Sequence, residues 1–101
     1  MSECGCGLTV HRILGTLREA SRSAFVDMAK GETREYMAEL LTKLQDHISE
    51  AELNCKADLR LVRVSVENMS VAVEAGSRRD FVFWGMRARD NLEGALERCA
   101  R

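Results

Sequence analysis

The chain has 101 residues, of which 31% are charged, and its formal net charge is −1. A chain of this length forms one domain, and its near-neutral charge excludes the global basic field of a nucleic-acid-binding protein. Its longest apolar run, Phe81 to Met86, is far too short to cross a bilayer, so we expect no membrane partner.

The N-terminal sequence, MSECGCGLTV, has no basic region followed by a long apolar run, so it does not resemble a secretory signal. We therefore expect a cytoplasmic protein. In that compartment the four cysteines are expected to be thiols or metal ligands rather than disulfides. Residues 1–7 are expected to form a flexible Cys-Gly tail, and residues 8–101 a single helical-bundle domain.

Two helices are predicted over residues 8–30 and 32–55, because apolar residues recur there at helical spacing. In the first helix these residues are Val10, Ile13, Leu14, Leu17, Ala20, Ala24, Phe25 and Met28, and in the second they are Met37, Leu40, Leu41, Leu44, Ile48, Ala51 and Cys55. Gly31 lies between the two segments and can end the first helix. Such a short connection predicts an antiparallel pair of helices.

The next segment, residues 59–75, fits either a hairpin of two strands or one helix. Apolar and polar residues alternate over Val62–Val66 and Met69–Val73, a period that is typical of half-buried strands. The same segment also has an apolar stripe at helical spacing, which consists of Leu59, Val62, Val66, Met69 and Val73. On a helix, Arg63 and Glu67 would form an ion pair four residues apart.

Three observations favour the helix. A hairpin turn at Glu67-Asn68 would lack the usual glycine, and no Gly or Pro occurs between Gly31 and Gly76. Thr, Tyr, Phe and Trp, which strands favour, are absent from the segment. Asp58 can cap the start of a helix and Gly76 its end. We therefore predict a third helix over residues 59–75.

A fourth helix is predicted over residues 77–101. The sequence Ser77-Arg78-Arg79-Asp80 resembles a capping box, and one face of the helix then carries Phe81, Trp84, Ala88, Leu92, Ala95, Leu96 and Cys99. Four helices with short connections predict an all-α, antiparallel up-down four-helix bundle. The alternative is an α+β fold, in which a helical hairpin packs on a small antiparallel sheet from residues 59–84 and a C-terminal helix.

The bundle interpretation leaves apolar residues uncovered. Leu61, Val64 and Val71 point away from the apolar stripe of the third helix, and Val82, Phe83 and Met86 fall off the apolar face of the fourth. One face of a bundle cannot cover both sides of a helix, and a contiguous exposed apolar patch marks an interaction site. We therefore predict a homodimer through these six residues. In the α+β alternative, the valines are covered within the monomer.

The up-down topology also predicts that the cysteines gather at one end of the bundle. Cys4 and Cys6 precede the first helix, His11 lies near its start, and Cys55 and Cys99 end the second and fourth helices. Such a thiolate-rich group suits Zn²⁺, Cu(I) or an iron–sulfur cluster. However, Cys-x-Cys is not the usual spacing of a zinc site. We therefore favour the interpretation in which Cys55 and Cys99 are small apolar core residues, Cys4 and Cys6 are free thiols, and no cofactor is expected.

No motif in the chain is specific enough to indicate a family or an enzymatic reaction. A phosphate-binding loop, a dinucleotide-binding fingerprint and a nucleophile elbow are all missing from the sequence. We therefore expect a small non-enzymatic helical-bundle protein that works through protein–protein contacts as a dimeric accessory or assembly module. The alternative function is that of a thiolate metal-binding or redox-responsive protein that uses the cysteine cluster.

Overall fold

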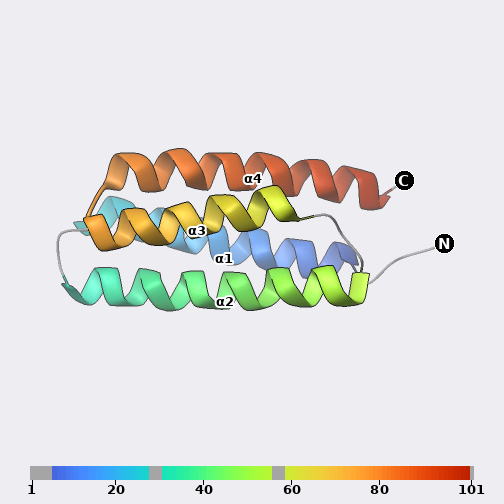
Figure 1. Cartoon of the computed structure of the whole chain (residues 1–101), viewed down its shortest axis with the longest axis horizontal. Helices are drawn as coiled ribbons and strands as arrows, with labels where there is room; N and C mark the ends of the chain where they lie inside the picture. Colours follow the sequence, from blue (N-terminus) through green and yellow to red (C-terminus); the bar gives the residue numbers. More distant parts are fainter. Residues whose placement is uncertain (1–5, 28–30, 56–58, 101) are drawn as a thin grey trace.

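Four helices make up the protein in the computed structural model, which describes residues 6–27, 31–55 and 59–100 (Figure 1). They are α1 (Cys6–Asp27), α2 (Gly31–Cys55), α3 (Arg60–Ala75) and α4 (Arg78–Ala100). No strand occurs in the described part of the chain, so the predicted all-α bundle is confirmed and the α+β alternative is wrong. Helix α1 begins at Cys6, so Cys6 and Gly7 belong to it rather than to the predicted tail.

The helices pack as a ring in which neighbours in sequence are neighbours in space. Helix α1 packs against α2 and α4, and α3 packs against the same two helices, whereas the described backbone segments do not come close across either diagonal. Consecutive helices run in opposite directions (Figure 1). The result is an elongated bundle of 46 × 19 × 18 Å, the shape expected when short connections join antiparallel helices whose axes are nearly aligned. Within the described ranges, no helix combines the length and apolar character that a membrane span requires.

The core is formed by the described members of the apolar stripes that the sequence predicts. The side chains of Ala24, Phe25, Met28, Cys55, Leu96 and Cys99, which the sequence also places on these stripes, lie outside the described part of the structure. The buried residues are Val10, Ile13, Leu14, Leu17 and Ala20 of α1; Met37, Leu40, Leu41, Leu44, Ile48 and Ala51 of α2; Leu59 just before α3, with Val62, Val66, Met69, Ala72 and Val73 within it; and Phe81, Ala88, Leu92 and Ala95 of α4. Trp84 is partly buried and packs against this core. Two buried residues of α3, Ser65 and Ala72, lie outside the predicted stripe. Both are small, and small side chains allow neighbouring helices to approach closely.

The turn between α3 and α4 forms as its local sequence predicts. Gly76 has a φ of 70°, in the left-handed region, where glycine has no steric penalty. The backbone N–H groups of Gly76 and Ser77 donate to the carbonyl groups of Val73 and Ala72, which gives the hydrogen-bond pattern of a Schellman motif. The Ser77 hydroxyl oxygen then accepts a hydrogen bond from the Asp80 backbone N–H, at 3.3 Å, and caps α4. The predicted cap at Asp58 lies outside the described residues.

Candidate functional site

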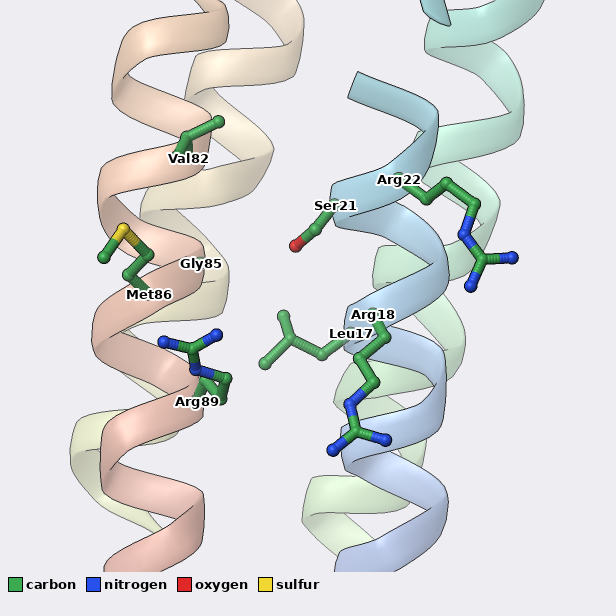
Figure 2. Close-up of a pocket in the computed structure, with 8 residues that line it drawn as sticks. All are labelled: Leu17, Arg18, Ser21, Arg22, Val82, Gly85, Met86 and Arg89. Atoms are coloured by element: carbon green, nitrogen blue, oxygen red, sulfur yellow. The ribbon is translucent and has the colours of Figure 1, made fainter. Parts of the chain in front are cut away.

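A groove runs between α1 and α4 on the outside of the bundle, with a volume of about 380 Å³ (Figure 2). It is lined by Leu17, Arg18, Ser21 and Arg22 of α1 and by Val82, Gly85, Met86 and Arg89 of α4. Figure 2 shows Leu17 and Ser21 pointing from α1 toward α4, and Val82 pointing back toward α1. Gly85 lines the groove on α4, where it faces Ser21 of α1 and Met69 of α3. A Cβ added to it would lie 3.5 Å from Ser21 Oγ and 3.5 Å from Met69 Cε.

The groove is positively charged, because no acidic residue lines it within the described chain. Arg22 is paired with Glu19 at 3.7 Å, and its guanidinium points away from α4 (Figure 2). Arg18 and Arg89 come from opposite walls; the Arg18 side chain runs along α1 and that of Arg89 lies against α4 (Figure 2). Neither has an ion-pair partner in the described part of the protein. The groove therefore combines an apolar floor with two uncompensated cations.

A second feature is an exposed stripe along α3, which we call the α3 stripe. It consists of Leu61, Val64, Asn68, Val71 and Ala75, which recur at alternating spacings of three and four residues. Leu61 is 67% exposed, Val64 is 47% exposed and Val71 is 64% exposed. The Asn68 side-chain amide donates to the Val64 carbonyl at 3.0 Å, which leaves its own carbonyl oxygen free to accept.

Arg63 shows which way the α3 stripe points. Its guanidinium forms an ion pair with Glu52 of α2 and donates a hydrogen bond to Ser49 Oγ at 3.1 Å. The ion pair that the sequence predicts, between Arg63 and Glu67, is therefore replaced by one that links two helices. Arg63 marks the flank of α3 that faces α2. At about 100° per residue, the centre of the exposed stripe lies about 120° around the helix from Arg63, on the outer surface toward α4.

An aromatic pair lies on α4, the helix that packs beside α3. The rings of Phe83 and Trp84 meet edge to face, with their centroids 5.1 Å apart. The Arg87 guanidinium lies 5.6 Å from the Phe83 ring centre and 5.8 Å from the Trp84 ring centre, within cation–π range. Trp84 lies about 200° around α4 from the groove residue Val82, on the flank away from α1.

The six residues predicted as one interface thus belong to different surfaces of the bundle. Leu61, Val64 and Val71 belong to the α3 stripe, whereas Val82 and Met86 line the groove beside α1. Phe83 is half exposed and contacts Trp84 and Arg87. The sequence did not single out Arg18, Ser21 and Arg89 as site residues, because they come from two helices and only the packing of those helices brings them to one groove.

The side chains of the predicted cysteine cluster lie outside the described part of the structure, whereas the helix ends that carry three of them lie within it. Cys4 lies outside the described residues, as do the side chains of Cys6, Cys55 and Cys99. The start of α1 and the ends of α2 and α4, which carry the latter three cysteines, lie at the same end of the bundle (Figure 1). His11 is exposed, five residues into α1. No metal-binding group of three His, Cys, Asp or Glu residues occurs among the side chains that the structure describes.

One electrostatic contact joins α1 to α2. The Tyr36 hydroxyl donates to Glu19 Oε2 at 3.4 Å. Partial burial of the phenol raises the pKa of Tyr36 above its ordinary value of 10.0, and the negative charge and hydrogen bond of Glu19 raise it further. Glu39 adds a smaller effect of the same sign.

No protein-family model matches the chain, and neither a characterised protein nor a solved structure matches it. The proposals for function therefore rest on the surfaces of the bundle.

Proposed function

We propose that the protein is a small, non-enzymatic interaction module that works as a homodimer in the cytoplasm, with the α3 stripe of one copy packed against that of another. The observation that carries this proposal is the position of the stripe, on the outside of a bundle whose core is already filled by the opposite face of α3. Single exposed apolar residues are normal on a protein surface. A row of exposed apolar residues at regular helical spacing forms a continuous surface, which favours contact with a partner helix.

The spacing within the stripe supports a second helix as the partner. Alternating steps of three and four residues keep one seam along a helix, which is the pattern of helices that pack knobs into holes. The stripe is also nearly symmetric about its centre, since Leu61 and Ala75 each lie seven residues from Asn68. A self-complementary surface of this kind suits a two-fold dimer, in which both copies use the same residues.

Asn68 supports two copies rather than a larger assembly. A single asparagine in an otherwise apolar seam sets the register and the number of helices, at some expense of stability. Its free carbonyl oxygen can accept a hydrogen bond from the Asn68 amide of the second copy. Placing the two-fold axis beside Asn68 brings these two side chains together.

The size of the surface indicates a weak dimer. From Leu61 to Ala75 the stripe is about 21 Å long, at 1.5 Å per residue. The aromatic pair Phe83 and Trp84, with Arg87, extends it across α4, and Trp and Arg are enriched where interfaces bind most strongly. A contact of this size is at the low end of specific interfaces. We expect a dissociation constant on the order of micromolar.

The experiment is size-exclusion chromatography with light scattering over a range of protein concentrations. The unmodified chain should shift from monomer to dimer through the micromolar range. The variant Leu61→Lys/Val71→Lys should remain a monomer, because it places four ammonium groups in the dimer seam. Both residues are exposed, so its helicity should be unchanged by circular dichroism.

The control is Leu53→Lys. Leu53 is a leucine of α2 that is 80% exposed, and α2 carries no residue of the α3 stripe. This variant should dimerise as the unmodified chain does. The proposal would be wrong if the unmodified chain stayed monomeric up to several hundred micromolar, or if Leu53→Lys abolished the dimer equally.

A second function, thiolate metal binding or redox sensing, is supported by the topology. Three of the helix ends at one end of the bundle carry Cys6, Cys55 and Cys99, and Cys4 is two residues from Cys6. We propose metal analysis of protein purified without chelator, with Cys55→Ser/Cys99→Ser as the variant. Bound Zn²⁺, copper or iron that this variant loses, with a Tm that a chelator lowers only in the unmodified chain, would favour this function. Absence of metal and a Tm insensitive to chelator would exclude the metal site.

A further inference from the structure

We propose that the groove between α1 and α4 binds an amphiphilic anion, namely a free carboxylate carried on an aliphatic chain. This activity is separate from dimerisation, because the groove lies on the flank of α4 that faces α1. The α3 stripe lies beyond the opposite flank, and the backbones of α1 and α3 do not come close along their described residues.

The floor of the groove suits an aliphatic chain. Leu17 and Val82 supply apolar walls from the two helices, and Gly85 leaves the space between them open (Figure 2). Met86 adds a flexible thioether at the edge, a side chain that adapts to apolar ligands of different shape. A volume of about 380 Å³ is within the range of small-molecule sites, which are mostly apolar with a few polar groups.

The rim of the groove suits a carboxylate. Arg18 and Arg89 come from opposite walls, and both lack an ion-pair partner in the described chain. A guanidinium presents paired N–H donors that match the two oxygens of a carboxylate. The Ser21 hydroxyl, which points into the groove, supplies a further donor (Figure 2). No acidic residue is among those that line the groove, and the neighbouring carboxylate of Glu19 is paired with Arg22.

The two features together distinguish an amphiphile from a simple anion or a neutral oil. Exposed arginines alone bind small anions weakly, because water screens the charge. An aliphatic chain in the floor removes apolar surface from water, and it places the carboxylate beside the arginines at the same time. Affinity should therefore require both the chain and the charge.

The test is titration of the full-length chain with sodium decanoate below its micelle concentration, followed by amide chemical shifts in two-dimensional NMR. Saturable shifts are expected over residues 17–22 and 82–89. Decanol, which keeps the chain but not the charge, should bind at least tenfold more weakly. Acetate, which keeps the charge but not the chain, should bind at least tenfold more weakly as well.

The variant Arg18→Gln/Arg89→Gln should weaken decanoate binding by about tenfold or more, the expected effect of losing charge-assisted hydrogen bonds. The control Arg12→Gln/Lys43→Gln removes the same charge from exposed positions outside both the groove and the α3 stripe, and it should alter affinity by less than about twofold. The proposal is overturned by an absence of saturable binding, by equal binding of decanol or acetate, by shifts centred elsewhere, or by an equal loss in the control. Because these readouts do not depend on the oligomeric state, they test the groove independently of the dimer.

Discussion

Tyr36 reports on the contact between α1 and α2 at the scale of a single residue. It is the only tyrosine of the chain, so the ultraviolet absorbance of phenolate follows this residue alone. Its hydroxyl donates to Glu19, and an acid that donates to a carboxylate loses its proton less readily. The folded protein therefore holds this proton more tightly than the unfolded chain does.

A pH dependence follows from the raised pKa of Tyr36. The contribution of this group to stability is fully present below the pKa of the unfolded chain, near 10.0. It is lost as the pH rises from there through the pKa of the folded protein, because the phenolate is disfavoured in the folded state. Above about pH 10, the free energy of unfolding should therefore fall more in the unmodified protein than in Tyr36→Phe. Urea unfolding at a series of pH values measures this difference.

Spectroscopic titration separates the causes of this pKa. Glu19→Gln should lower the midpoint toward 10.0, and Glu39→Gln should lower it less. Glu32→Gln, which removes an exposed carboxylate from the first turn of the same helix, serves as the control. An unchanged midpoint in Glu19→Gln would contradict the contact with Glu19.

At the scale of the element, two glycines act in opposite ways on helix stability. Gly76 ends α3 with a φ of 70°, a conformation that costs other residues roughly 1–2 kcal/mol. Gly15 lies inside α1, is exposed, and has no other atom within 4 Å of the position of an added Cβ. Glycine inside a helix is about 0.8–1.0 kcal/mol less favourable than alanine.

The same substitution at these two positions should therefore have opposite signs. Gly76→Ala should lower the free energy of unfolding by roughly 1–2 kcal/mol. Gly15→Ala should raise it by about 0.5–1 kcal/mol. Urea unfolding monitored by circular dichroism gives both values, and each variant controls for the other. Stabilisation by Gly76→Ala would show that α3 does not end in the left-handed turn.

Segment 59–75 shows how an element can be ambiguous locally and still be predictable. Its valines fit a strand as well as a helix, and valine itself favours strands. The ends of the segment favour the helix, because Gly76 and Ser77 close one helix and start the next within two residues. The prediction of a helix is confirmed, and the spare valines are exposed on its outer side.

At the scale of the whole molecule, the bundle has two separate surfaces on either side of α4. The α3 stripe is apolar around a single asparagine, and the groove beside α1 is apolar with cationic walls. The first suits another copy of the same helix, and the second suits a carboxylate carried on an aliphatic chain. The two proposals can therefore fail or succeed independently.

Dimerisation should make the Tm of the protein depend on its concentration. Association of folded copies stabilises the folded state by mass action, so Tm should rise with protein concentration. The variant Leu61→Lys/Val71→Lys should show a Tm that does not change with concentration, whereas Leu53→Lys should behave as the unmodified chain does. Thermal unfolding at several concentrations provides the measurement. A constant Tm in the unmodified chain, across concentrations that span the expected dissociation constant, would contradict the dimer.

The pattern of residues alone predicts three of the helices, their core-facing stripes and the turn at Gly76-Ser77, and it favours a helix over a hairpin for residues 59–75. These features are local, because the face on which a side chain lies depends on its own helix and a cap depends on a few adjacent residues. The ring order of the helices, the pairing of Arg63 with Glu52 and the groove between Arg18 and Arg89 were decided by the tertiary structure. Each of these depends on how one helix is rotated against another. That rotation is set by the packing of the whole core rather than by the pattern of any one segment.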